Sequence, residues 1–451
     1  MKDLDLIVKA YDIRGTYPDQ IDADTCRALG IGFAEFVKTV EPTTTEVVIG
    51  RDMRPSGPEL VDAFANGVQS QGLDVLDVGL ASTDLIYFAS GSLGLPGVMF
   101  TASHNPAGYQ GIKTCLSGAT PIGEDSGLAD IKRVAISGAE AAPTSGSRRS
   151  DDMLERFATH VRSFINADGL RPLKVIADTA NGMGGLVVPA SFEGLPFELE
   201  VLFGELDGTF PNHPADPIQI ENLADLRARV LETGADIGLA FDGDADRVFL
   251  VDENAEPVSG SLTTALLAQM ILRDNPGGGV IYNLICSKVV PEMIVESGGV
   301  PIRSRVGHSF IKQTMAEEDA VFGGEHSAHY YFRDNWRADS GLIASMMVLE
   351  ELSRSGKTLS ELLAPLKRYE ASGEINTRVS DAAAVIEHVA AHYADQTIDR
   401  LDGLTVDLGE WWFNLRPSNT EPLLRLNLEA PDQAAVDARV AEVQAAMAEV
   451  G

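Results

Sequence analysis

Three segments of the chain share one pattern of apolar and polar residues. Each begins with a short apolar run rich in β-branched residues, continues through a polar or glycine-rich loop, and ends in a sequence that suits a helix. The segments are EVVIGRDMRPSG (residues 46–57), LKVIADTANGMGG (173–185) and GVIYNLICSKVV (279–290). Apolar runs without alternation are typical of strands buried on both faces, as in parallel sheets covered by helices. The pattern therefore predicts three similar α/β domains built from strand–loop–helix units.

The C-terminal part of the chain has a different pattern. An apolar run, WWFNL, meets the polar loop RPSNTEP and then LLRLNL, which predicts a strand, a loop and a second strand. Helical spacing predicts an amphipathic helix at the end of the chain, with its apolar face formed by Val436, Val440, Val443, Met447 and Val450. We therefore expect a smaller α+β domain after the three α/β domains.

Changes in composition mark the predicted domain boundaries. Residues 137–150 (SGAEAAPTSGSRRS) are small and polar, which predicts a linker without regular structure. A second break is expected after DGDADRVFLVD, near Asp252, and a third between Ser353 and Tyr369. The predicted domains are residues 1–146, 147–252, 253–366 and 367–451.

Composition and charge narrow the functional classes. Hydrophobic residues make up 44% of the 451-residue chain, enough for several buried cores. With 67 acidic and 35 basic residues the net charge is -32, which argues against general binding to nucleic acid or anionic lipid. Three widely spaced cysteines, Cys26, Cys115 and Cys286, favour neither a disulfide framework nor a cysteine-based zinc site. Neither a secretory signal nor a membrane span is visible, so we expect a cytoplasmic protein.

The acidic loop FDGDADRVFLVD predicts a metal site. Asp242, Asp244 and Asp246 alternate, so a curled loop brings three carboxylates together, and such hard oxygen ligands suit Mg²⁺ or Ca²⁺. An EF-hand fits poorly, because Arg247 replaces its turn glycine and strand-like runs flank the loop. The alternative is a solvated acidic turn. Arg247 favours a site, since its guanidinium can bind a phosphate oxygen while a metal neutralises another.

A second loop, GVMFTASHNPAGYQGIK, places Ser103 at the end of a predicted strand over residues 98–101. Ligands bind at strand ends in α/β folds. No Gly-x-Ser-x-Gly elbow surrounds Ser103, so a hydroxyl near a metal loop favours phosphoryl transfer over acyl transfer. The alternative is an ordinary turn, in which Ser103 and Asn105 bond to local backbone and Pro106 fixes the bend.

The loop RPSNTEP concentrates phosphate donors between two prolines: Arg416, Ser418, Asn419 and Thr420. A planar guanidinium with hydroxyl and amide groups suits a phosphate. A polar hairpin tip is an equally good interpretation of this loop alone.

The segment GGEHSAHYYF has Glu325, Ser327 and His329 at alternate positions. In an extended loop these side chains project from one side, where a carboxylate and a hydroxyl suit sugar hydroxyls. By itself this signal is weak, because a single histidine is more often structural. Nearby, VGHSFIK adds His308 and Lys312.

Taken together, TASHNP, DGDADR, GEHSAH and RPSNTEP, in this order, resemble the α-D-phosphohexomutase family over nearly the whole chain, from KAYDIRG onward. The match is closest to its phosphomannomutase/phosphoglucomutase branch, because the sugar loop contains GEHSAH. The resemblance implies three related α/β domains and a smaller C-terminal α+β domain around a central cleft. In order along the chain, these would carry the phosphoserine loop, the metal loop, the sugar loop and the phosphate-binding loop.

The resemblance also implies residue roles. Ser103 would be phosphorylated and, with Asp242, Asp244 and Asp246, would hold Mg²⁺. Glu325 and Ser327 would bind sugar hydroxyls, and Arg416, Ser418, Asn419 and Thr420 would bind the non-reacting phosphate. The cleft would be lined by Tyr11, Arg14, Lys113, Arg247, His308 and His329, with Lys113 and His329 as candidates for proton transfer. One departure concerns NLICSK, where we place Ile285 at a position at which family members often have lysine. Lys288 is a possible substitute.

The reaction so implied moves a phosphoryl group between O6 and O1 of a hexose through a hexose 1,6-bisphosphate, which also serves as activator. Mannose phosphates and glucose phosphates are the expected substrates. The partners would be small sugar phosphates only, and the protein a monomer or weak homodimer. Two alternatives are a Mg²⁺-dependent sugar phosphatase and a non-catalytic sugar-phosphate sensor.

Overall fold

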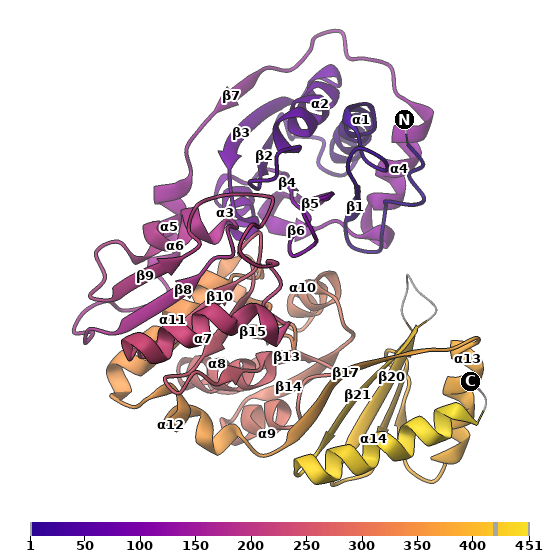
Figure 1. The fold of residues 1–451 in the computed structure, drawn as a ribbon. Helices are drawn as coiled ribbons and strands as arrows, with labels where there is room; N and C mark the ends of the chain where they lie inside the picture. The colour runs from indigo at the N-terminus through magenta and orange to yellow at the C-terminus, as the bar shows by residue number, and fades with distance from the viewer. Residues whose placement is uncertain (1, 418–422, 450–451) are drawn as a thin grey trace.

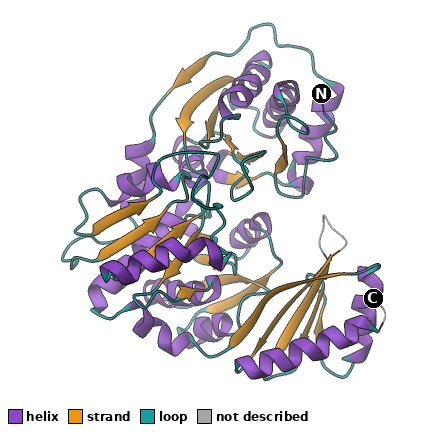
Figure 2. Ribbon diagram, viewed as in Figure 1, coloured by secondary structure: helices purple, strands orange, loops and turns teal. Residues whose placement is uncertain are grey.

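The computed structural model describes residues 2–417 and 423–449, and it contains four β-sheets in chain order (Figure 1). The first three sheets are each covered by helices, whereas the fourth is an antiparallel sheet with helices of its own (Figure 2). This is the predicted architecture of three α/β domains followed by a smaller α+β domain. All three predicted strand–loop–helix segments are confirmed.

The first sheet has the order β1-β5-β4-β2-β3-β7, with β6 paired to β5. Its strands are β1 (Ile13–Thr16), β2 (Glu46–Arg51), β3 (Asp74–Leu80), β4 (Gly97–Phe100), β5 (Tyr109–Leu116), β6 (Thr120–Pro121) and β7 (Arg148–Ser150). Its helices are α1 (Ala23–Val40), α2 (Gly57–Ser70), α3 (Thr83–Leu93) and α4 (Leu128–Ser137). The strands β2, β3 and β4 are parallel, and β5 is antiparallel to β4.

The strand β7 lies in the segment that we expected to be an unstructured linker. It pairs in parallel with β3, so the first sheet extends to Ser150, past the predicted boundary at residue 146. All three residues of β7 are exposed. A polar segment can pair with the edge of a sheet, because strand pairing needs only main-chain hydrogen bonds and no apolar side chains. For that reason the apolar pattern gave no signal here.

The second sheet has the order β12-β11-β10-β8-β9. Its strands are β8 (Lys174–Asp178), β9 (Glu198–Leu202), β10 (Ile237–Phe241), β11 (Val248–Val251) and β12 (Pro257–Val258), and its helices are α5 (Leu154–Arg162), α6 (Gly184–Phe192) and α7 (Ala224–Thr233). The antiparallel pair β10 and β11 is joined by the acidic loop. Its position directly after a fully buried parallel strand places the loop at a strand end.

The third sheet has the order β14-β13-β15-β16. Its strands are β13 (Gly279–Asn283), β14 (Val300–Ser304), β15 (Phe322–Gly324) and β16 (Tyr330–Phe332). The helices of this domain are α8 (Gly260–Asp274), α9 (Val289–Glu296), α10 (His308–Glu317), α11 (Gly341–Ser355) and α12 (Leu359–Leu363).

The fourth sheet is antiparallel throughout and has the order β17-β21-β20-β19-β18. Its strands are β17 (Glu370–Arg378), β18 (Thr397–Asp399), β19 (Leu404–Asp407), β20 (Trp412–Pro417) and β21 (Leu423–Ala430), with helices α13 (Ala382–His392) and α14 (Gln433–Ala448). The predicted hairpin is therefore confirmed as β20 and β21. The predicted C-terminal helix is α14, which buries Val436, Val443 and Met447, while Val450 lies outside the described residues.

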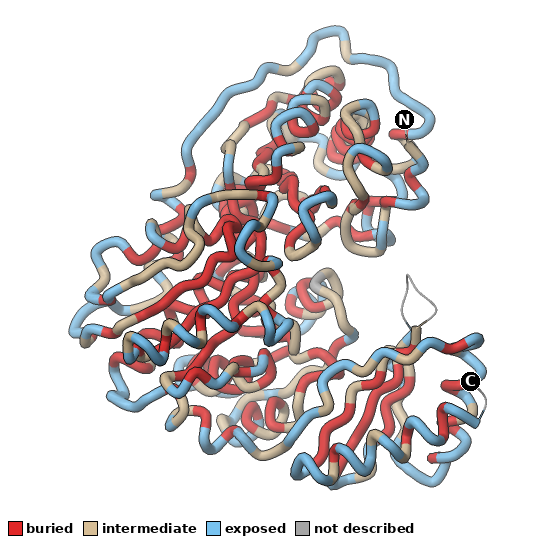
Figure 3. Tube along the Cα trace, viewed as in Figure 1, coloured by how far each residue is buried: buried red, intermediate tan, exposed pale blue. Residues whose placement is uncertain are grey.

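The apolar cores show which domains are packed together. One continuous cluster of buried residues runs from the first sheet through the second to the third, for example from Val48 through Ile176 to Val280. The fourth sheet packs around a separate cluster that includes Phe413 and Leu426. In Figure 3, buried segments gather in the interior of each domain and where the first and second domains meet. In residues 2–417 and 423–449, no helix combines the length and apolarity that crossing a membrane requires.

Candidate active site

Ser103 lies two residues past the sequence predicted as a strand and three past the end of β4. Ser103 is 5% exposed, and its φ of 48° is in the left-handed region that non-glycine residues seldom adopt. The Ser103 hydroxyl donates to Asp242 Oδ2 at 2.7 Å and accepts from Arg247 Nη2 at 3.2 Å. The structure thus brings together the serine loop of the first domain and the acidic loop of the second, 139 residues apart.

The acidic loop is a strand–loop–strand turn with Ala245 at a φ of 60°. Ligand oxygens of Asp242, Asp244 and Asp246 all lie within 4.8 Å of one another, as the alternating spacing predicts. Exposure of these residues is at most 1%, so the loop is not a solvated acidic turn. Flanking strands, in place of helices, also exclude the EF-hand interpretation.

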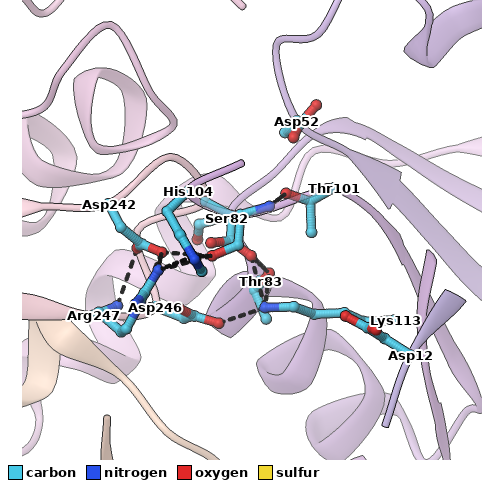
Figure 4. Close-up of polar contacts among 12 residues, drawn as sticks. Asp12, Asp52, Ser82, Thr83, Thr101, His104, Lys113, Asp242, Asp246 and Arg247 are labelled. Atoms are coloured by element: carbon cyan, nitrogen blue, oxygen red, sulfur yellow. Dashed lines mark hydrogen bonds and ion pairs between the residues drawn. The ribbon is translucent and has the colours of Figure 1, made fainter. Parts of the chain in front are cut away.

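Two buried cations balance this acidic loop (Figure 4). Lys113, on β5, extends its ammonium to Asp244 Oδ2 at 2.8 Å and to Asp246 Oδ2 at 2.6 Å. Arg247 donates to Asp242 Oδ2 from Nε at 3.0 Å and from Nη2 at 2.7 Å. Burial of several charges without such pairing would be very costly.

The pKa values of this cluster follow from its burial and its pairing. Burial raises the pKa of Asp242 to about 7, with Asp244 and Asp246 contributing, against the opposing charge of Arg247. Burial alone would also raise the pKa of Asp244, but the ammonium of Lys113 lowers it well below its usual range. Lys113 itself has a pKa raised well above its usual value, because Asp244 and Asp246 outweigh its desolvation. Lys113 is therefore protonated at neutral pH.

The donor set of the acidic loop fits a hard divalent cation. Asp244 Oδ1 and Asp246 Oδ1 are buried and have no hydrogen-bond partner among the described residues. Free carboxylate oxygens gathered at one point are the ligands that Mg²⁺ takes in proteins. The residues Asp242, Asp244 and Asp246 could therefore hold this ion beside the Ser103 hydroxyl.

His329 extends this network into the third domain. Its Nδ1 is 2.8 Å from Asp339 Oδ2 and 3.9 Å from Asp246 Oδ1. Burial alone would lower the pKa of His329, but Asp246 and Asp339 raise it overall. Lys312, which is 3% exposed, lies 3.0 Å from Asp339 Oδ1 and 3.6 Å from the Tyr87 ring centroid. Charged residues of all three α/β domains therefore meet around the acidic loop.

The sugar-loop segment is a hairpin loop between β15 and β16, and it is not extended as we expected. Glu325 N donates to His329 O at 3.0 Å, and Ala328 has a φ of 64°. The alternating side chains consequently have different partners. Glu325 Oε2 accepts from Asn283 at 2.9 Å and its Oε1 from Tyr331 at 2.6 Å, whereas His329 contacts Asp339. Ser327 is partly exposed.

The remaining predicted residues lie on the first and fourth domains. Arg14 donates to Asn105 Oδ1 at 2.6 Å and is paired with Asp12, so it adjoins the serine loop. The Tyr11 hydroxyl is 3.3 Å from the carbonyl of Val306. Tyr11 and Arg416 line a cavity of about 820 Å³ that also includes Arg305 of the third domain. This cavity and the Ser103 cluster involve different residues.

Some predicted residues are not described at side-chain level. Ser418, Asn419 and Thr420 lie outside the described residues. His308 begins α10, and its side chain is not described. The alternative cation Lys288 is 2.7 Å from Asp407 of the fourth domain. Ile285 is 7% exposed and packs with Leu284 and Trp412.

Sequence reasoning missed four groups that complete the cluster. The Thr83 hydroxyl donates to Asp244 Oδ2 at 2.5 Å, and the side chain of His104 is paired with Arg247. The charge of Arg247, with burial, lowers the pKa of His104 to about 2, so this imidazole is neutral. Asp339 and Asn283 orient His329 and Glu325. His104 lies within TASHNP and Asn283 within NLICSK, whereas Thr83 and Asp339 lie outside the recognised motifs and became visible only when distant segments were brought together.

Comparisons with known proteins agree with this geometry. Models of phosphoglucomutase/phosphomannomutase α/β/α domains I, II and III match residues 5–140, 154–256 and 259–369, and the C-terminal domain model matches residues 374–446. The chain is 41% identical over 441 residues to "Phosphohexose mutases" of Xanthomonas campestris pv. campestris, covering 96% of this chain and 97% of that protein. It is 40% identical over 435 residues to a phosphomannomutase of Escherichia coli K12, covering 94% of each. A solved phosphoglucomutase/phosphomannomutase family protein from Burkholderia thailandensis superposes with a TM-score of 0.90 at 33% identity, covering 99% of this chain and 98% of the other.

Proposed function

Because the chain belongs to the phosphoglucomutase/phosphomannomutase family and is a phosphohexomutase, we propose that Ser103 carries the phosphoryl group that the enzyme transfers to and from the sugar. In the proposed reaction, phosphorylated Ser103 donates to one hydroxyl of a hexose monophosphate. The resulting hexose 1,6-bisphosphate turns over, and Ser103 takes back the other phosphoryl group. The observation that carries this proposal is the Ser103 hydroxyl held between Asp242 and Arg247.

The charges around Ser103 suit phosphoryl transfer. Positioning and charge stabilisation supply most of the catalysis in such reactions. Arg247 Nη2 is 3.2 Å from Ser103 Oγ, so the guanidinium can bind an oxygen of the transferring group. Mg²⁺ held by Asp242, Asp244, Asp246 and the Ser103 phosphate would supply further positive charge to the phosphoryl oxygens.

Proton transfer is assigned to His329 and Lys113 in different roles. Lys113 is protonated between Asp244 and Asp246, so it can stabilise charge or donate a proton but does not serve as a base at neutral pH. His329 has a pKa raised from its ordinary value near neutrality, which suits a group that gains and loses a proton during turnover. Asp339 bonds to its Nδ1, so we assign Nε2 to proton transfer with the substrate hydroxyl.

The sugar and the non-reacting phosphate are assigned to the third and fourth domains. We assign O3 and O4 of the hexose to Glu325 and Ser327, with Asn283 and Tyr331 fixing the Glu325 carboxylate. Arg416, with Ser418, Asn419 and Thr420, would bind the non-reacting phosphate, and Tyr11, Arg14 and His308 would line the same cleft. The proposed role of Arg416 in phosphate binding is supported by its position on the wall of the cavity of about 820 Å³.

This assignment predicts dual substrate use. Reorientation of the intermediate by roughly half a turn nearly exchanges O3 and O4, so one Glu325–Ser327 pair can serve both orientations. Neither orientation requires contact with C2, where mannose and glucose differ. The kcat/KM values for mannose 1-phosphate and glucose 1-phosphate should therefore lie within about 10³-fold of each other, and a larger preference would contradict the assignment.

The test is a coupled mutase assay with catalytic glucose 1,6-bisphosphate and Mg²⁺. Ser103→Ala should lose activity by about 10²-fold or more, since a covalent carrier has been removed. Ser137→Ala, at the exposed end of α4, is the matched control and should behave as wild type. Peptide mass should also show a phosphoryl group on Ser103 that substrate removes. Steady release of inorganic phosphate would indicate a phosphatase, and absence of turnover a sensor.

A further inference from the structure

Arg54 is among the largest fully buried side chains of the protein, yet it belongs to none of the four recognised motifs. It lies between β2 and α2 and is 1% exposed, and its side chain is fully buried. A buried cation is tolerated only when its charge and its hydrogen-bond donors are satisfied. The groups that satisfy Arg54 therefore indicate what it does.

Every donor of the guanidinium has an acceptor, and four of the five acceptors lie in the serine loop. Nε donates to Asp52 Oδ2 at 3.1 Å, which balances the charge. Nη2 donates to the carbonyls of Ser103 at 2.9 Å and Asn105 at 2.7 Å. Nη1 donates to the carbonyls of Pro106 at 2.9 Å and Tyr109 at 3.1 Å. A planar fork of five N–H groups is a property of arginine that lysine cannot reproduce.

These bonds act on a strained part of the backbone. Ser103 has a φ of 48°, and a non-glycine residue keeps this left-handed conformation only where its surroundings hold it there. A bond to the Ser103 carbonyl fixes the orientation of the following peptide plane. Because a trans peptide holds its N–H opposite its carbonyl, the amide of His104 points away from Arg54.

The same residue also connects the serine loop to the second domain. The ring of Phe210 lies 5.2 Å from the Arg54 guanidinium carbon, and a Cβ on Gly208 would come within 2.6 Å of Arg54 Cα. The second domain also carries Asp242 and Arg247, which hold the Ser103 hydroxyl. Among the described contacts, the Arg54 side chain bonds to the backbone carbonyl of Ser103 and to no side-chain atom of Ser103, Asp242 or Arg247.

We propose that Arg54 is a positioning residue for phosphoryl transfer: by binding four carbonyls of residues 103–109, it holds the Ser103 hydroxyl in line with Asp242 and Arg247. This inference rests on the proposed role of Ser103. Displacement of a reacting group by about 1 Å can lower a rate by about 10²-fold. Loss of the fork should therefore slow the chemical step while leaving the sugar and phosphate contacts, which lie on other loops, intact.

The experiment compares Arg54→Lys with Asp52→Asn and with a matched control, Arg51→Lys. Arg51 is three residues away, and its guanidinium donates to the carbonyl of Asp52 and to none of the carbonyls of residues 103–109 among the described contacts. Each protein is phosphorylated with glucose 1,6-bisphosphate and mixed with glucose 6-phosphate in a single-turnover assay with Mg²⁺. Transfer from Ser103 is followed by intact mass, KM by steady-state assay, and folding by the melting temperature.

Arg54→Lys should lower the single-turnover rate by about 10²-fold while KM changes by less than about threefold. Asp52→Asn, which keeps an acceptor for Nε, should lower the rate by about tenfold, and Arg51→Lys should match wild type. A merely structural arginine would leave rate and KM unchanged in protein that remains folded at the assay temperature.

A folded Arg54→Lys variant with a rate within about threefold of wild type would overturn the inference. If Arg54→Lys does not fold, a rate within about threefold for Asp52→Asn overturns it instead. A wild-type protein with no phosphorylated Ser103 and no mutase activity would refute the proposed function, and this inference with it. An active wild type with active variants refutes the inference alone.

Discussion

Lys113→Met removes the cation between two buried carboxylates and leaves a side chain of similar volume. Lys113 Nζ is 2.8 Å from Asp244 Oδ2 and 2.6 Å from Asp246 Oδ2, and both aspartates are at most 1% exposed. Loss of one partner from a buried ion pair costs about 3–5 kcal/mol, because the remaining charge is uncompensated. The first three domains share one core. For a cooperative unit of roughly 370 residues, 1 kcal/mol shifts the melting temperature by little more than about 1 °C, so it should fall by roughly 4–6 °C in EDTA.

Addition of Mg²⁺ should reverse much of this loss. A cation at about 100 times its Kd stabilises the folded state by about 2.7 kcal/mol, if it binds only there. The same carboxylates that Lys113 balances would bind this ion. Mg²⁺ should therefore raise the melting temperature of Lys113→Met more than that of wild type. In wild type the Lys113 ammonium already neutralises part of the negative charge that would attract the ion.

Lys312→Met is the matched control. Lys312 is also buried, at 3% exposed against 8% for Lys113, and its ammonium is 3.0 Å from Asp339 Oδ1, outside the three-aspartate loop. It should melt at a lower temperature than wild type, without a Mg²⁺ response greater than that of wild type. Differential scanning fluorimetry in EDTA and in Mg²⁺ measures all three proteins. Melting of Lys113→Met within about 2 °C of wild type in EDTA, or equal restoration of both lysine variants by Mg²⁺, would show that Lys113 does not balance the metal-site carboxylates.

Three further predictions address stability and binding. His213 Nε2 is 3.0 Å from Asp178, and this carboxylate outweighs burial to raise the pKa of His213. The stabilisation is present at low pH and is lost as pH rises through the raised pKa, so the melting deficit of His213→Gln should be larger near about pH 5.5 than near about pH 8.5; an equal deficit would contradict this. A Cβ on Gly111 would come within 2.6 Å of Thr101 O and 2.7 Å of Ile13 O, whereas one on Gly108 meets nothing within 4 Å. Gly111→Ala should therefore melt several degrees lower than wild type and Gly108→Ala close to it, and similar melting of both would count against tight strand packing there. Arg416→Lys should raise KM for glucose 1-phosphate by about tenfold with less effect on kcat, because a contact to a non-reacting phosphate persists throughout the reaction, and a loss in kcat alone would argue for a different role.

Local pattern was sufficient for the elements and for the motif loops. The apolar runs at residues 46–51, 174–178 and 279–283 are strands because a doubly covered sheet needs apolar residues on both faces. Similarly, the alternation of Asp242, Asp244 and Asp246 was enough to predict three carboxylates at one point, since a short loop can curl in few ways. The strand β7 escaped prediction because main-chain pairing at a sheet edge requires no particular side chain.

The sequence alone determined the order of the domains and the clustering of the three aspartates in the acidic loop, since these depend on residues near one another in the chain. Its resemblance to the phosphohexomutases indicated Ser103 as the candidate carrier. Only the tertiary structure decided that Lys113, Asp246 and Asp339, from three domains, form one charged network around Ser103. It also decided that the sugar loop is a tight hairpin and that Arg54 holds the serine loop through backbone carbonyls. Every residue has a carbonyl, so no side-chain pattern signals such a contact, and buried charges find their partners only when distant segments pack together.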